Sequence, residues 1–170
     1  MRLQTVAGWR KLLLSTLLCT GTLAKKDKPS VKSKKFDFVP VHVQYFDDSD
    51  VILCENAPAG VVWRSDNAGE DWDKVSGVPE GKAMSVTMHP YDPKRAYIIT
   101  MDKTHWKTED RGEHWEEFSV DAVPSIFDAK AGVLSFHAGD PDKIIFNGMD
   151  CAGIFCTEVV SPPGASCVDG

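Results

Sequence analysis

Two stretches of this chain follow one pattern: RSDNAGEDW at residues 64–72 and KTEDRGEHW at residues 107–115. Each stretch passes from a small hydroxyl residue through Asn or Asp and then Gly to a tryptophan, with the same spacing in both. The two tryptophans, Trp72 and Trp115, are 43 residues apart. Sequence repeats of about 40–45 residues are typical of chains built from successive four-stranded units. The spacing therefore predicts that the chain repeats one small β-sheet.

A second landmark repeats with nearly the same period. The stretch HPYDPKRAYII begins at His89, and the stretch HAGDPDKIIF begins at His137, which is 48 residues later. Short apolar runs such as VHVQYF (41–46) and VILCE (51–55) lie between turns rich in Asp, Gly and Pro, which is the pattern of short strands. We therefore predict an all-β fold made of β-propeller blades, located at about residues 40–78, 82–120 and 126–157.

We call residues 65–72 the first box and residues 108–115 the second box. Each box lies where a tight hairpin must join the third and fourth strands of a blade. Its glycine can adopt a positive φ at low cost, its Asn or Asp can bond backbone N–H groups along the turn, and its hydroxyl adds another local bond. An active site needs a single constellation, whereas this pattern recurs. We therefore interpret these residues as structural and not catalytic: Ser65, Asn67, Gly69, Trp72, Thr108, Asp110, Gly112 and Trp115.

The two ends of the chain differ from its middle. Residues 1–24 combine three positive charges with a short apolar run that ends in small residues, the pattern of a secretory signal peptide. We expect a flexible basic leader at residues 25–35, the partial propeller over 36–157 and a divergent, unstructured tail at 158–170. Beyond the signal peptide, no stretch of the sequence is long and apolar enough to span a bilayer. The product is therefore expected to be lumenal or secreted.

Four of the five cysteines follow the expected signal peptide. An even number in an oxidising compartment is compatible with disulfides, and several pairings remain open. Cys151 and Cys156 are near enough in sequence to join the ends of one loop, so they form the candidate disulfide. Cys54 lies inside an apolar run and would alternatively remain a free core residue.

Charge and motifs exclude several classes of function. The formal net charge of -6 argues against a surface for nucleic acid or for an anionic membrane. The five histidines show no metal-ligand spacing, and the sequence contains no phosphate-binding or dinucleotide-binding motif. FDDSD at residues 46–50 suggests calcium, but Asp and Ser clusters between strands more often form plain turns. We expect no cofactor and no metal.

Residues 36–148 resemble the start of the ten-bladed β-propeller of the sortilin family, and within it the fungal vacuolar sorting receptors. The resemblance rests on YFDDSDVIL, RSDNAGEDW, HPYDPKRAYIIT, HWKTEDRGEHW and on IIFNG before Cys151. It implies the lumenal, cargo-binding part of a receptor and no enzyme. Such receptors carry soluble vacuolar hydrolases such as carboxypeptidase Y from the late Golgi to the prevacuolar, endosomal compartment.

The sequence departs from the family pattern in several places. Asn67 and Asp71 replace the Asp and Thr usual in the first box, which should weaken that turn slightly. Because the sequence accounts for two blades and part of a third, we expect a truncated fragment that is not competent as a receptor alone. Two alternatives remain: a fragment of a sialidase-like glycoside hydrolase, which shares the box, and a small secreted β-module. The sequence does not locate the cargo-binding residues.

Overall fold

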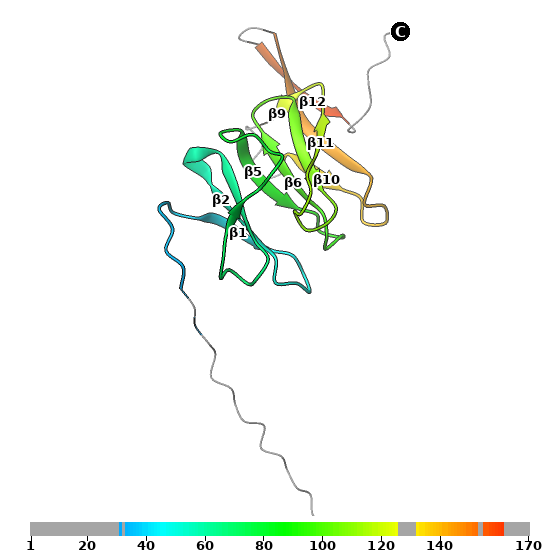
Figure 1. Cartoon of the computed structure of the whole chain (residues 1–170). Helices are drawn as coiled ribbons and strands as arrows, with labels where there is room; N and C mark the ends of the chain where they lie inside the picture. The colour runs from blue at the N-terminus through cyan, green and yellow to red at the C-terminus, as the bar shows by residue number, and fades with distance from the viewer. Residues whose placement is uncertain (1–30, 32, 126–131, 153–154, 162–170) are drawn as a thin grey trace, which may run out of the picture. The chain divides into compact units, whose positions relative to one another are not determined.

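The computed structural model describes residues 31, 33–125, 132–152 and 155–161 of the chain. The expected signal peptide and most of the basic leader lie outside these residues. Within them the fold is all-β, as predicted, with twelve strands arranged in three antiparallel sheets (Figure 1). No helix among the described residues is long and apolar enough to cross a membrane.

The first sheet contains four strands that neighbour one another in chain order. A short 3-10 turn, η1 (Ala57–Ala59), joins the second strand to the third, and Gly60 ends the turn with a φ of 59°. A Cβ on Gly60 would lie 2.7 Å from the backbone carbon of Gly81, so glycine is required there for close approach as well as for φ. The strands are β1 (Val41–Tyr45), β2 (Ile52–Asn56), β3 (Val61–Ser65) and β4 (Asp73–Lys74).

The second sheet repeats this arrangement with longer outer strands. Its four strands again lie in chain order, and its third and fourth strands flank the second box just as β3 and β4 flank the first. The strands are β5 (Ala83–Met88), β6 (Ala96–Thr100), β7 (Thr104–Thr108) and β8 (Glu116–Ser119).

The third sheet departs from the pattern. It contains β9 (Val123–Pro124), β10 (Leu134–Phe136), β11 (Ile144–Ala152) and β12 (Phe155–Ser161). β9 and β10 pair with different parts of β11, while β12 pairs with β11 from Phe146 to Ala152. β12 runs to Ser161, four residues beyond the boundary expected at residue 157 between blade and tail. The strand extends this far because β12 stays paired with β11 up to the pair Phe146–Ser161. The remainder of the expected tail, residues 162–170, lies outside the described residues.

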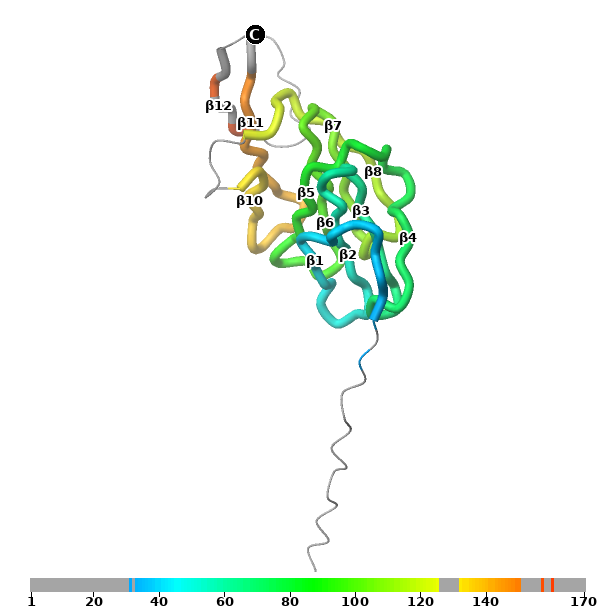
Figure 2. Tube along the Cα trace, turned by 90° about the vertical axis from the view of Figure 1, so that its left-hand side faces the viewer, coloured from blue at the N-terminus to red at the C-terminus, as the bar shows by residue number. Residues whose placement is uncertain are grey.

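The sheets pack face to face because alternate residues of each strand face opposite neighbours. Between the first and second sheets, a core forms from Phe46, Leu53, Val62, Val86, Ala96, Ile98 and Trp106. Between the second and third sheets, another core forms from Tyr97, Ile99, Val120, Ala122, Leu134, Ile144 and Phe146. Figure 2 shows the second sheet, in green, between the other two.

Candidate functional site

The first box is closed by its own side chains. The Ser65 hydroxyl donates to Asn67 Oδ1 at 3.0 Å and accepts the Gly69 N–H at 2.9 Å. Asn67 Oδ1 also accepts the Asp71 N–H at 2.9 Å. The indole of Trp72 folds back and donates to the Gly69 carbonyl at 3.0 Å. These bonds fix the hairpin between β3 and β4 from within.

The second box makes the same four bonds at the equivalent atoms. Thr108 Oγ1 donates to Asp110 Oδ1 at 2.8 Å and accepts the Gly112 N–H at 2.9 Å. Asp110 Oδ1 accepts the His114 N–H at 2.9 Å, and Trp115 Nε1 donates to the Gly112 carbonyl at 3.1 Å. The two boxes thus close in the same way, although Asn67 supplies an amide oxygen where Asp110 supplies a carboxylate oxygen.

The structure adds one feature of the boxes that the sequence pattern did not show. The residue before each glycine, Ala68 or Arg111, also has a positive φ, of 57° and 61° respectively. In this conformation the Ala68 N–H donates to the Asp50 carbonyl and the Arg111 N–H to the Lys94 carbonyl, both at 2.9 Å. Each box is therefore tied to the turn between the first two strands of its own sheet. Neither Ala nor Arg signals positive φ, so sequence reasoning could not find them.

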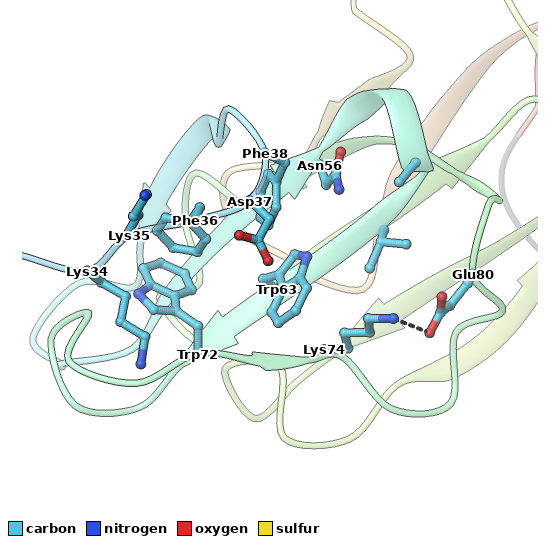
Figure 3. Close-up of a pocket in the computed structure, with 12 residues that line it drawn as sticks. Lys34, Lys35, Phe36, Asp37, Phe38, Asn56, Trp63, Trp72, Lys74 and Glu80 are labelled. Atoms are coloured by element: carbon cyan, nitrogen blue, oxygen red, sulfur yellow. Dashed lines mark hydrogen bonds and ion pairs between the residues drawn. The ribbon is translucent and has the colours of Figure 1, made fainter.

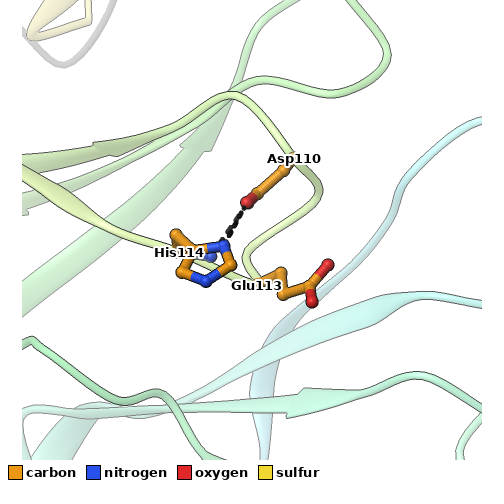
Figure 4. Close-up of side chains that lie close together, drawn as sticks. All are labelled: Asp110, Glu113 and His114. Carbon is orange, nitrogen blue, oxygen red and sulfur yellow. Dashed lines mark hydrogen bonds and ion pairs between the residues drawn. The ribbon is translucent and has the colours of Figure 1, made fainter.

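The second box carries a local pair of charges (Figure 4). His114 Nδ1 lies 2.6 Å from Asp110 Oδ2, and the hydrogen bond that the ring donates to Asp110, followed by the charge of Asp110, raises the pKa of His114. Burial opposes the charge of Asp110, but hydrogen bonds from the His114 backbone, the His114 ring and Thr108 outweigh it and lower the pKa of Asp110. Glu113, Asp110 and His114 each offer a ligand atom within 4.8 Å of one another. A cation there would compete with the bonds that close the box, so this cluster does not overturn the expectation of no metal.

The two boxes also meet across the joint between the first two sheets. Arg64, on β3, donates from Nε to the Arg111 carbonyl at 3.1 Å. A Cβ added to Gly112 would lie 3.4 Å from Leu53 and 3.5 Å from Arg64. Residues of both boxes line one cavity of about 180 Å³. The boxes are thus brought close together, but the side chains of Ser65, Asn67, Thr108 and Asp110 are occupied by bonds within their own loops.

The described surface also contains a larger cavity, of about 370 Å³, on the face of the first sheet that points away from the second (Figure 3). Phe38 stacks on Trp63 with ring centres 5.6 Å apart, and Phe36 meets Trp72 edge-on at 5.4 Å. Charged groups surround these rings, namely Lys34, Lys35, Asp37, Lys74 and Glu80. The cavity therefore offers stacking and ionic contacts for binding.

The end of the basic leader takes part in this region. Lys34 Nζ donates to Asp71 Oδ1 in the first box at 3.2 Å, so at least this lysine contacts the folded sheets. Sequence reasoning had placed all lysines of residues 25–35 in a flexible, solvated segment. The alternation of Phe36 and Phe38 around Asp37 was the signal that could have identified the contact, since both rings pack on the sheet.

The cysteines occupy two different environments. Cys54 is a free, buried thiol on β2, and burial, followed by the charge of Glu55, raises its pKa to about 11. Cys151 and Cys156 are directly opposite in the antiparallel register of β11 and β12. Opposite residues in an antiparallel pair have Cα atoms about 4.5–5.5 Å apart, a separation that disulfides accept. The disulfide remains a prediction, and this backbone register supports it.

Comparison with known proteins gives three findings. The chain matches the family model described as Sortilin-Vps10 (sortilin, neurotensin receptor 3) over residues 60–162. It is 50% identical over 155 residues to "Vacuolar protein sorting/targeting protein 10" of Verticillium alfalfae, covering 91% of this chain and 11% of that protein. The protein of the same name from Colletotrichum graminicola is 44% identical over 156 residues, covering 92% of this chain and 10% of the relative. The chain therefore spans about a tenth of the length of these relatives.

A solved structure also shows a distant likeness. The GH74 xyloglucanase of Xanthomonas campestris is 19% identical, with a TM-score of 0.46, covering 69% of this chain and 20% of the enzyme. At this low structural similarity, the match supports no conclusion about the fold or the reaction chemistry of this chain.

Proposed function

Since the chain belongs to the Sortilin-Vps10 family, we propose that residues 36–161 form the first blades of a ten-bladed β-propeller that binds protein cargo in the lumen of the secretory pathway. The proposed cargo is a soluble vacuolar hydrolase such as carboxypeptidase Y. The proposed route leads from the late Golgi to the prevacuolar, endosomal compartment.

The observation that carries this proposal is the 50% identity, over 91% of this chain, to a protein named for vacuolar sorting and targeting. The structure supports it because the first two sheets have the same strand order and the same box closure. Each sheet also buries one face against the next. Successive sheets joined in this way are the units from which propellers are built.

We also propose that the chain has no enzymatic activity of its own. The relatives that it resembles carry the name of a sorting protein. In the described structure, the candidate residues of both boxes are committed to hydrogen bonds within their own hairpins. An arginine cluster for an acidic sugar is not formed either, because Arg64 and Arg95 are engaged at different sheet junctions. The glycoside hydrolase alternative therefore gains no support from the described residues.

The proposal can be tested by exchanging a segment in a vacuolar sorting receptor. Residues 36–161 would replace the aligned segment of the Verticillium relative, and the chimera would be isolated from a strain that lacks its own receptor. We expect carboxypeptidase Y to be recovered with the chimera as it is with the unmodified receptor. A stable, correctly localised chimera that recovers no carboxypeptidase Y would contradict the proposal.

A further inference from the structure

The two junctions between sheets use different residues at two equivalent positions. Val62 and His105 each directly precede the tryptophan of the third strand in their sheets, Trp63 and Trp106. The register confirms the equivalence, since Trp63 pairs with Cys54 on β2 and Trp106 pairs with Ile98 on β6. The first junction therefore has valine where the second junction has histidine.

The second pair of equivalent positions lies at the turn after the first strand of each sheet, β1 in the first sheet and β5 in the second. Phe46 donates its N–H across this turn to the Val51 carbonyl at 3.1 Å, and His89 donates to the Arg95 carbonyl at 3.0 Å. Phe46 is part of the core between the first and second sheets. The ring of His89 meets Phe136 of the third sheet with ring centres 4.6 Å apart. A phenylalanine at the first junction thus corresponds to a histidine at the second.

His105 is enclosed between the second and third sheets. Its side chain is fully buried, and its ring stacks on Phe146 with centres 4.9 Å apart and against Phe118 at 5.4 Å. Its Nδ1 accepts the backbone N–H of Thr100 at 3.2 Å. Its Nε2 is buried without a hydrogen bond. The charged group that acts on the ring is Asp102.

His89 has the same arrangement at the other end of this junction. Its Nδ1 accepts the backbone N–H of Tyr91 at 3.1 Å, and its Nε2 is buried without a well-formed hydrogen bond. Burial lowers its pKa; Asp92 and the Pro141 carbonyl favour the charged ring, and Arg95 opposes it. The other titratable neighbours are the phenols of Tyr91 and Tyr97, whose ring centres lie 6.1 Å and 6.5 Å away.

Both rings are built to remain neutral. Nδ1 can accept a backbone N–H only while it carries no proton, so protonation would set two N–H groups against each other. A charged imidazolium would also be buried against the apolar ring of Phe146 or Phe136, which costs free energy. The charge becomes acceptable once the third sheet separates from the second and water reaches the rings.

We propose that His105 and His89 make the packing of the third sheet on the second sensitive to acid, while the junction between the first and second sheets is not. At the first junction the equivalent residues are Val62 and Phe46, which do not titrate. The histidine of the first sheet, His42, is exposed and lies 3.0 Å from Glu55, outside the core between the first and second sheets.

The size of the pH effect follows from the thermodynamic linkage between protonation of the histidines and opening of the junction. The pKa of His105 is lowered by burial from 6.5 to about 4, with Asp102 opposing the shift. A group with a lowered pKa contributes its full stabilisation above pH 6.5 and loses it as the pH falls toward 4. From these values, the population with the junction open should be about tenfold larger at pH 5.5 than at pH 7.5.

Hydrogen–deuterium exchange of the whole chain at pH 7.5 and pH 5.5 tests the proposal, after correction for the pH dependence of chemical exchange. We expect the protection of amides in β10 and the first half of β11 to fall about tenfold at pH 5.5, while amides in β2 and β3 keep theirs. The matched variant combines His89→Phe with His105→Val, which installs the residues of the first junction. In this variant, the fall in amide protection of β10 and β11 at pH 5.5 should disappear.

Unchanged protection of β10 and β11 in the wild-type protein, or an equal fall in the double variant, would overturn the proposal. If the double variant does not fold, an NMR titration of the wild-type histidines decides the question. A midpoint for His105 well below 6, reached together with the loss of protection in the third sheet, would support the proposal. A midpoint near 6.5 in a fully protected third sheet would overturn it.

Discussion

The carboxylate of Glu55 accepts a hydrogen bond of 2.7 Å from the backbone N–H of Val86, although the two residues lie in different sheets. Gln44, also in the first sheet, donates to the Val86 carbonyl at 2.8 Å. Val86 lies on β5, the edge strand of the second sheet, and an edge strand leaves backbone groups without a ladder partner. Two side chains of the first sheet thus satisfy both backbone groups of Val86.

Replacing Glu55 by leucine should destabilise the protein because it leaves the buried N–H of Val86 without an acceptor. The expected cost is about 1–3 kcal/mol in the free energy of unfolding, measured in urea. Glu55→Gln keeps an acceptor oxygen and should cost less. The control is Glu117→Leu, at an exposed glutamate on β8. Equal losses in Glu55→Leu and Glu117→Leu would show that the contact with Val86 contributes nothing.

Removing the hydroxyl of the second box should weaken its hairpin. Thr108→Val keeps the shape of the side chain but leaves the buried Gly112 N–H without its acceptor, at a cost of about 1–3 kcal/mol. Thr108→Ser restores the hydroxyl and should recover most of the loss. Thermal unfolding of the three proteins checks this prediction, which fails if the valine and serine variants melt together.

The contribution of His114 should depend on pH. Its pKa is raised, first by the hydrogen bond that its ring donates to Asp110 and then by the charge of Asp110. A raised pKa means that the stabilisation is complete below the ordinary value of 6.5 and is lost as the pH rises through the raised pKa.

His114→Ala should therefore lower the melting temperature at pH 6 more than at pH 9. The first box has Asp71 at the equivalent position, so Asp71→Ala is the matched control and should show no such alkaline decline. A gap between wild type and His114→Ala that is the same at both pH values would contradict the ion pair.

Cys151 and Cys156 should be joined in protein recovered from an oxidising compartment. In peptide mapping, both cysteines should resist alkylation until a reductant is added. Cys54 should react only after unfolding, because it is buried and its pKa is raised to about 11 by burial and by Glu55. Alkylation of Cys151 in the unreduced, folded protein would rule out the disulfide.

The sequence predicted the repeat well because its signals are local. In each box the glycine adopts the positive φ that the turn needs, and the tryptophan bonds back to that glycine. Both features lie within one short stretch of sequence. The contact between Glu55 and Val86 was not predictable in this way. A glutamate near the end of a short strand normally points to solvent, and its burial depends on the edge of a sheet 31 residues away.

The third sheet was the least predictable part of the fold. No box follows β12 to mark its end, so the blade boundary was placed at residue 157, although the strand runs to Ser161. The pairing of β9 with Gly148 and Met149 of β11 depends on close approach at Gly148, where a Cβ would lie 2.6 Å from Ala122. Such contacts between distant residues leave no periodic trace in the sequence.

The most direct test of the proposed function is the fate of carboxypeptidase Y in living cells. A strain without its own sorting receptor would express the chimera that carries residues 36–161, and secreted and vacuolar carboxypeptidase Y would be measured by immunoblotting. We predict that the chimera retains the hydrolase in the vacuole as the unmodified receptor does. Secretion of the hydrolase, by cells in which the chimera is stable and reaches the Golgi and endosomes, would contradict the account.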